Sequence, residues 1–156
     1  MTYREWFESH SRRHRAIIES LPPMSPEALV DYFRYENMQQ KHPDFCPLYA
    51  KNEKCHEMED LNCYLCGCPS FRFCDEGIDQ VDGIVRYSLC AIDAKEGRAL
   101  ETDNAIHQDC SKCLLPHRRS FILKHFDRDW MKIMEKCEAC PVTAVQELSA
   151  GKSPED

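Results

Sequence analysis

The chain has 156 residues, 42% of them hydrophobic and 30% charged, which is typical of a soluble protein with one domain and a modest core. Its formal charge of −7 argues against nucleic acid as the main partner, because phosphate binding needs a basic face. No segment approaches a membrane span, and the first residues lack the apolar run of a signal peptide. We therefore expect a cytoplasmic protein with no membrane or nucleic-acid partner.

The first predicted element is an amphipathic helix over residues 3–21. Aromatic and apolar side chains recur there at spacings of three and four residues. Thr2 and Glu5 form a capping box at its start, and Pro22 ends it. The aromatic stripe is interpreted as a surface that packs on the core, with a binding face for a protein partner as the alternative.

A second helix is predicted to begin after Ser25 and to end near Gln40. Ser25 is a good N-cap, and Pro26 suits the first helical position. With the first helix it forms a predicted helical hairpin over residues 1–43.

The segment from residue 45 to 74 shows neither helical nor strand periodicity. It has few aliphatic residues, so we expect metal binding to supply folding energy that a missing apolar core does not. Its cysteines are Cys46, Cys55, Cys63, Cys66, Cys68 and Cys74.

Two Cys-x-x-Cys pairs are the strongest chemical signal in the chain. Cys63 with Cys66, and Cys110 with Cys113, supply four soft ligands, a full set for one zinc ion or one iron–sulfur cluster. Eleven cysteines in a cytoplasmic chain are better explained by metal binding than by disulfides, because that compartment keeps thiols reduced. We predict shared ligation by these four thiols.

Four further residues are candidates for a second site. Cys68 cannot join a zinc ion that already has four thiolates, so it binds elsewhere, replaces one of the four, or stays a free thiol beside the site. Cys55, His56 and His117 are able to join it. His117 is alternatively a hydrogen-bond donor to a sulfur atom or a plain surface histidine.

Short strands and a loop are predicted between the two thiol pairs. Residues 84–89 suit a strand, with a helix from Gly77 as the alternative, and residues 105–108 suit another strand. Residues 95–104 are polar and are predicted to form a loop.

A third helix is predicted over residues 120–136, from an apolar stripe that ends at Cys137. Cys137 and Cys140 form another Cys-x-x-Cys, open to two interpretations: metal ligands or buried inert thiols. Residues 149–156 are expected to be a flexible tail.

Three blocks resemble the cysteine-rich small domain family of bacteria and archaea, a zinc-finger-like family described as metal binding. They are Cys55-His56, Asn62-Cys63-Tyr64-Leu65-Cys66-Gly67-Cys68-Pro69, and Asp109-Cys110-Ser111-Lys112-Cys113-Leu114-Leu115-Pro116-His117-Arg118. Gly67 replaces an expected aromatic residue, and the segment from Cys74 to Ala105 is longer than in the family. The resemblance implies metal ligation by the matching cysteines and histidines, and it favours iron–sulfur over zinc.

These observations predict a mostly α fold with an irregular, metal-stabilised cysteine-rich core. It consists of an N-terminal helical hairpin (1–43), a zinc-ribbon- or knuckle-like metal-binding domain (44–119), a C-terminal helix with its Cys-x-x-Cys (120–148) and the tail (149–156). The predicted function is an iron–sulfur protein, with a 4Fe-4S cluster, that acts in electron transfer or accessory redox or sulfur chemistry with a protein redox partner or enzyme. The alternative is a structural zinc module for protein–protein interaction. We identify no catalytic base, so an enzymatic role stays open.

Overall fold

The computed structural model describes residues 1–138, so Cys140 and the predicted tail lie outside the described residues. The chain forms two compact units, each built from segments that are distant in the sequence. The first unit contains Met1–Phe7, Pro69–Cys113 and, among the described residues, 134–138. The second unit contains Glu8–Cys68 and Leu114–Ile133. The ranges expected from the sequence for separate domains stay a prediction.

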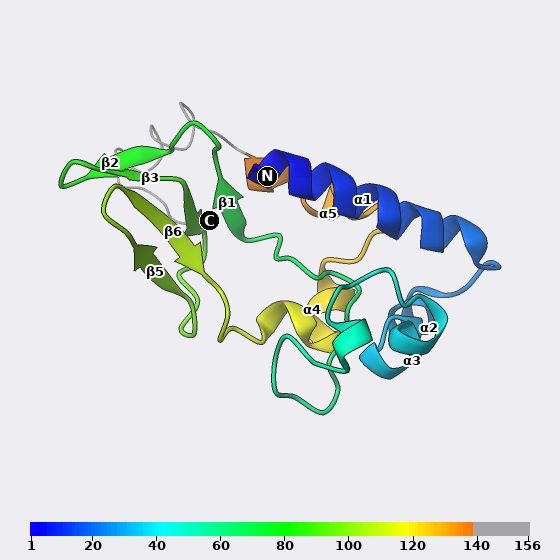
Figure 1. The fold of residues 1–156 in the computed structure, drawn as a ribbon. Helices are drawn as coiled ribbons and strands as arrows, with labels where there is room; N and C mark the ends of the chain where they lie inside the picture. Colours follow the sequence, from blue (N-terminus) through cyan, green and yellow to red (C-terminus); the bar gives the residue numbers. More distant parts are fainter. Residues whose placement is uncertain (139–156) are drawn as a thin grey trace. The chain divides into compact units, whose positions relative to one another are not determined.

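The expectation of a mostly α fold is wrong, because the described residues contain six strands in two sheets (Figure 1). All six strands belong to the first unit, and each is three to five residues long. Strands this short show too few alternations for a period of two to be recognised reliably, so the sequence predicts strands only at 84–89 and 105–108 and misses the others. The strands are β1 Phe71–Phe73, β2 Asp79–Val81, β3 Ile84–Arg86, β4 Ser88–Cys90, β5 Arg98–Glu101 and β6 Ala105–Asp109.

The first unit contains a two-stranded and a four-stranded sheet. β1 pairs with β4 in antiparallel fashion, and the larger sheet has the strand order β2-β3-β6-β5. Only β3 and β6 are parallel, with Val85 opposite Ala105 and Arg86 opposite Ile106. The predicted strand near residues 105–108 is confirmed as β6, whereas the predicted loop over 95–104 is wrong because it contains β5.

Aromatic packing joins the start of the chain to β1 within the first unit. Tyr3 lies 5.5 Å from Phe71 and 5.1 Å from Phe73 between ring centroids, and Phe7 lies 4.9 Å from Phe73. These contacts fix the first turn of α1, which spans Tyr3–Ser20.

The predicted N-terminal helices are confirmed in position but not in continuity. Helix α1 begins with the predicted capping box, since the Thr2 amide donates to Glu5 and the Glu5 amide donates to Thr2 Oγ1. Ser25 caps α2 by accepting from the Ala28 amide, as predicted. The second predicted helix is interrupted, however, and forms α2 (Pro26–Tyr32) and α3 (Tyr35–Lys41).

The core of the second unit is aromatic and includes two histidines. His10 lies 4.7 Å from Trp130, and His14 lies 4.6 Å from Tyr64, between ring centroids. The side chains buried with them include Phe33, Phe45, Tyr49, Leu61 and Leu65. The segment after residue 45 therefore does bury an apolar core, against our expectation that metal would have to replace one.

The predicted third helix over 120–136 is wrong as a continuous element. It forms α4 (Arg119–Lys124), α5 (Trp130–Ile133) and the short 3-10 turn η3 (Glu135–Glu138). The break has a local cause, because the Asp127 carboxylate accepts the amide of Asp129 and so favours a turn. The Tyr64 hydroxyl donates to the Asp127 carbonyl in the same turn.

Within the described residues, no helix combines the length and the apolar character that crossing a membrane requires.

Candidate metal site

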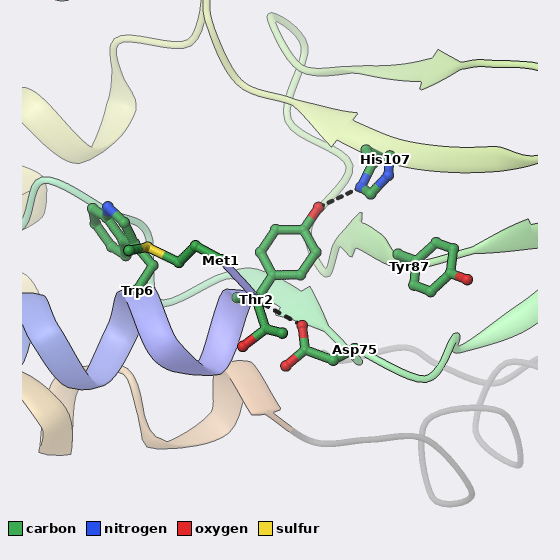
Figure 2. A pocket seen from close by; sticks show the side chains of 7 residues that line it. Met1, Thr2, Trp6, Asp75, Tyr87 and His107 are labelled. Atoms are coloured by element: carbon green, nitrogen blue, oxygen red, sulfur yellow. Dashed lines mark hydrogen bonds between the residues drawn. The ribbon is translucent and has the colours of Figure 1, made fainter.

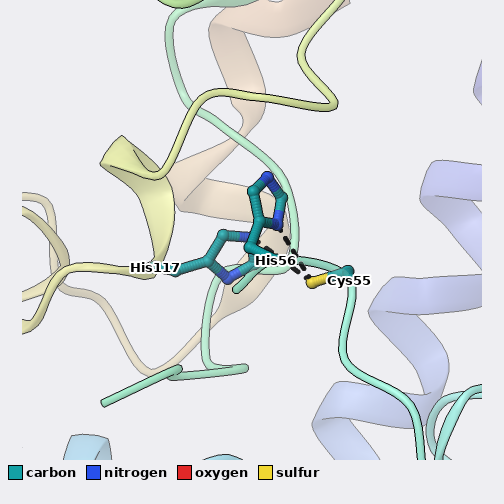
Figure 3. Close-up of side chains that lie close together, drawn as sticks. All are labelled: Cys55, His56 and His117. Carbon is teal, nitrogen blue, oxygen red and sulfur yellow. Dashed lines mark hydrogen bonds between the residues drawn. The ribbon is translucent and has the colours of Figure 1, made fainter. Parts of the chain in front are cut away.

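Three predicted ligands converge in the second unit: Cys55, His56 and His117. Their ligand atoms all lie within 4.8 Å of one another, and no other such group of three is found in the described residues. Figure 3 shows the two imidazole rings side by side with the Cys55 sulfur next to both. The residues come from an irregular loop after the 3-10 turn η1 (Tyr49–Lys51) and from the 3-10 turn η2 (Leu115–His117).

The two sulfur–nitrogen distances in this group are close to those of a tetrahedral metal site. The Cys55 sulfur lies 3.2 Å from His56 Nδ1 and 3.8 Å from His117 Nε2. Ordinary zinc–sulfur and zinc–nitrogen bonds at tetrahedral angles place the sulfur and nitrogen ligands about 3.5 Å apart. The two observed distances lie on either side of that value.

His117 is held in the orientation and the tautomer that a metal ligand needs. Its Nδ1 lies 2.9 Å from the carbonyl oxygen of Asn62, and a carbonyl oxygen only accepts, so Nδ1 carries the proton. Nε2 then presents a lone pair toward Cys55. Burial, chiefly, lowers the pKa of His117, and so favours the neutral ring that binds metal.

Asn62 is itself fixed by the fold. The amide of Tyr35 donates to the Leu61 carbonyl, and the amide of Cys63 donates to the Phe33 carbonyl, which joins the segment to the α2–α3 junction. The Asn62 side chain donates to the Val30 carbonyl and is buried. The carbonyl that orients His117 thus belongs to a rigid segment.

His56 is less firmly held than His117. Its Nδ1 faces the Cys55 sulfur, while its Nε2 is buried and has no hydrogen-bond partner among the described residues. Because a metal-bound histidine usually donates its second N–H to an oxygen, the geometry of His117 fits ligation better than that of His56.

Three thiols of the second unit, those of Cys55, Cys63 and Cys66, have raised pKa values, which favour the protonated state when no cation is present. Burial raises the pKa of Cys63 to about 12, and the negative charges of Cys55 and Cys46 also raise it. Burial and the charges of Cys63, Cys46 and Cys55 raise the pKa of Cys66. Burial, and to a smaller extent the charge of Cys46, raises the pKa of Cys55 as well. A cation among these thiols would replace their protons, which is how thiolate ligands are formed.

Both Cys-x-x-Cys pairs follow an Asx turn. The Asn62 side-chain oxygen accepts the Tyr64 amide at 2.8 Å, and the Asp109 carboxylate accepts the Ser111 amide at 3.0 Å. In each pair the residue before the first cysteine therefore bends the chain into the turn between the sulfurs. This explains why an asparagine and an aspartate precede the two pairs.

Cys66 has an unusual backbone, with φ of 45°. The other described residues with positive φ are glycine, asparagine or aspartate, which tolerate this left-handed region. A cysteine held there stores strain of about 1 kcal/mol, which suggests that the position of its sulfur matters.

The predicted four-thiolate set falls in both units. Cys63 and Cys66, together with Cys68, belong to the second unit, whereas Cys110 and Cys113 belong to the first. Each unit is described by itself, so shared ligation by the two pairs stays a prediction. Cys68 is not part of the group formed by Cys55, His56 and His117.

No family model, curated protein or solved structure matches the chain. The resemblance to the cysteine-rich small domain family therefore rests on its motif residues alone and stays a prediction. Cys55, His56 and His117 were predicted together, with Cys68, as candidates for a second site, and the resemblance includes them too, although the two histidines are 61 positions apart in the sequence.

The sequence did not indicate the part that Asn62 plays in orienting His117, because a backbone carbonyl has no sequence signature. The asparagine before Cys63 was a usable signal only for the turn. The pocket of the first unit, described below, was missed as well, since its residues are ordinary aromatic and polar residues far apart in the sequence.

Proposed function

We propose that this protein is a metal-binding protein and that its second unit binds one metal ion through Cys55, His56 and His117. The observation that carries the proposal is the hydrogen bond from His117 Nδ1 to the buried Asn62 carbonyl, which leaves Nε2 facing a thiol. This is the outer-sphere contact by which proteins orient a ligating histidine.

Zinc is the ion that this donor set favours. One thiolate and two imidazoles suit a borderline-soft ion with tetrahedral preference, whereas a 4Fe-4S cluster is held by four thiolates. The three residues would leave a fourth position for a water molecule or a thiol.

The proposal is tested by the zinc content of purified protein, measured by elemental analysis after dialysis. His117→Gln removes the oriented nitrogen and is expected to lower zinc retention at least about tenfold, within the range found when ligand-shell contacts are lost. His125→Gln is the matched control, because it removes a half-buried histidine that is not part of the site. Equal zinc content in both variants would contradict the proposal.

An iron–sulfur protein stays the second candidate, supported by the same Asx turn before each of the two predicted thiol pairs. Such a cluster would use Cys63, Cys66, Cys110 and Cys113 and would suit electron transfer. Protein purified without oxygen should then be coloured and contain acid-labile sulfide. A colourless protein with stoichiometric zinc would exclude this candidate.

A further inference from the structure

The first unit contains a pocket that the proposed metal site does not use. Its volume is about 560 Å³, within the range of small-molecule sites. Aromatic rings make up much of its wall: Tyr3 lines the pocket together with Trp6, Tyr87 and His107, and the last three are labelled in Figure 2. The lining is mainly apolar, so a ligand would be recognised largely by contact with ring faces.

One carboxylate, Asp75, adds a negative charge to this pocket. Among the described residues that line the pocket there is no lysine or arginine. The guanidinium of nearby Arg4 pairs with Glu138, and no ion pair is found for Asp75 within the described part of the chain. The lining side chains therefore favour cations over anions, while the α-amino group of Met1, which also lines the pocket, offsets part of the charge of Asp75.

The carboxylate is held in place before any ligand arrives. Asp75 Oδ1 accepts the Tyr3 amide at 2.9 Å, and Oδ2 accepts the Arg4 amide at 3.2 Å. These bonds cap the first turn of α1, so the side chain does not have to be ordered on binding. Each oxygen already has a donor, which leaves limited capacity for further N–H groups.

A hydrogen-bond chain fixes the aromatic wall in the same way. The Gln108 amide donates to Ser88 Oγ at 2.6 Å, so the Ser88 hydroxyl is available to donate to Tyr3 Oη, 3.0 Å away. The Tyr3 hydroxyl in turn lies 2.6 Å from His107 Nδ1 (Figure 2). His107 stacks on Tyr87 at a ring distance of 5.5 Å and an angle of 13°.

We propose that this pocket binds a small organic cation of the quaternary ammonium type. A methylated ammonium group matches aromatic faces beside one carboxylate, because its charge is spread over methyl groups that need no hydrogen-bond acceptors. A primary ammonium would need three acceptors, and a metal ion would need several oxygen ligands, whereas Asp75 is the only carboxylate among the described residues that line the pocket.

Choline is the probe that tests the proposal. Titration of the full chain should shift the indole N–H signal of Trp6 in a nitrogen–proton correlation spectrum and saturate. The matched ligand is the uncharged carbon isostere of choline, in which a tert-butyl group replaces trimethylammonium. We expect it to bind at least about tenfold more weakly, since it lacks the attraction to the rings and to Asp75. Equal binding of the two compounds, or no saturable shift with choline, would overturn the proposal.

Two variants locate the site. Asp75→Asn should weaken choline binding about tenfold, whereas Asp82→Asn removes the same charge from an exposed turn of the same unit and should leave binding unchanged. Because Asp75 also caps α1, Tyr87→Leu provides an independent variant that removes a ring face and keeps the charge. Binding that is unchanged in both pocket variants would overturn the assignment.

Discussion

At the scale of single residues, Asn62 connects the local turn, the core and the candidate metal site. Its side-chain oxygen accepts the Tyr64 amide, its side-chain amide donates to the Val30 carbonyl, and its backbone carbonyl accepts from His117. All three contacts are made by a residue that is almost fully buried. Replacement of this one side chain should therefore affect both stability and the orientation of His117.

Asn62→Asp tests this. The carboxylate still accepts the Tyr64 amide, but it cannot donate to the Val30 carbonyl, and it brings a charge into a buried position. We expect the free energy of unfolding to fall by about 1–3 kcal/mol, the cost of a lost buried hydrogen bond, measured by urea denaturation. Asn104→Asp, at an exposed position, should change stability by less than about 0.5 kcal/mol. Similar losses in the two variants would contradict the role assigned to Asn62.

The site residues were predictable to different degrees. Cys55, His56 and His117 were predicted as ligands of a second site with Cys68, and these three converge in the structure, whereas Cys68 does not join them. The role of the Asn62 carbonyl was not predictable, because any residue has a carbonyl and only the fold brings this one to His117.

At the scale of elements, local chemistry was predictable where a side chain signals its own role. The capping box of Thr2 and Glu5 and the N-cap Ser25 are present as expected. The apolar stripe over 120–136 led to a wrong prediction of one continuous helix, because the apolar periodicity continues across a turn made by Asp127 and Asp129. Side chains on either side of a break still face the same core, so the stripe alone does not reveal it.

The β2–β3 hairpin carried a usable signal that was missed. Asp82 and Gly83 form a two-residue loop between the strands, with φ of 52° and 83°. Asp-Gly is favoured in such loops because both positions need positive φ. Recognition of this pair would have shown that residues 79–86 form two strands.

Two glycines, Gly83 in the loop of this hairpin and Gly77 just before it, allow a matched test of its packing. Gly77 and Gly83 both have positive φ, but an added Cβ at Gly77 would lie 2.6 Å from Val85 Cγ1, whereas nothing lies within 4 Å at Gly83. Gly83→Ala should cost about 1 kcal/mol from backbone strain alone. Gly77→Ala should lower the free energy of unfolding by at least about 1 kcal/mol more than Gly83→Ala does, because the Val85 side chain must move to make room for the added Cβ. If urea denaturation shows the same loss of free energy of unfolding for both variants, then β3 accommodates the added Cβ at Gly77 without an energetic cost.

The histidine face of α1 makes stability depend on pH. Burial lowers the pKa of His10 to about 3 and of His14 to about 4, well below the ordinary value of 6.5. Between those values the unfolded chain binds protons that the folded chain does not, so the free energy of unfolding falls as the pH falls below 6.5. The loss is at most about 1.4 kcal/mol per pH unit for each histidine.

His14→Leu should therefore flatten the pH dependence of the free energy of unfolding between about pH 6.5 and pH 4.5. His125→Gln should flatten it less, because partial burial lowers the pKa of His125 by a smaller amount. The measurement is urea denaturation in the presence of a chelator, so that loss of bound metal does not contribute. An unchanged slope in His14→Leu would show that His14 takes up a proton in the folded state without penalty.

At the scale of the whole molecule, the segment from residue 45 to 74 was expected to depend on metal for its order, because it is poor in aliphatic residues. The segment instead buries Phe45, Tyr49, Leu61, Tyr64 and Leu65, each no more than 4% exposed. Counting aliphatic residues underestimated this core, because aromatic side chains supply more buried area per residue. A metal ion at the proposed site would then add to an apolar core and would not replace it.

The presence of this aromatic core predicts how the protein responds to removal of metal. A chelator should lower the melting temperature but leave the far-ultraviolet circular dichroism spectrum of a folded protein, because the aromatic core remains. Zinc added back at a hundred times its dissociation constant should restore about 2.7 kcal/mol, the linkage expected for one site. His117→Gln should show the lower melting temperature from the start and no response to zinc. If the chelator instead abolished the folded spectrum, metal coordination would be the main source of order in the second unit, and the aromatic core would be insufficient to maintain its fold.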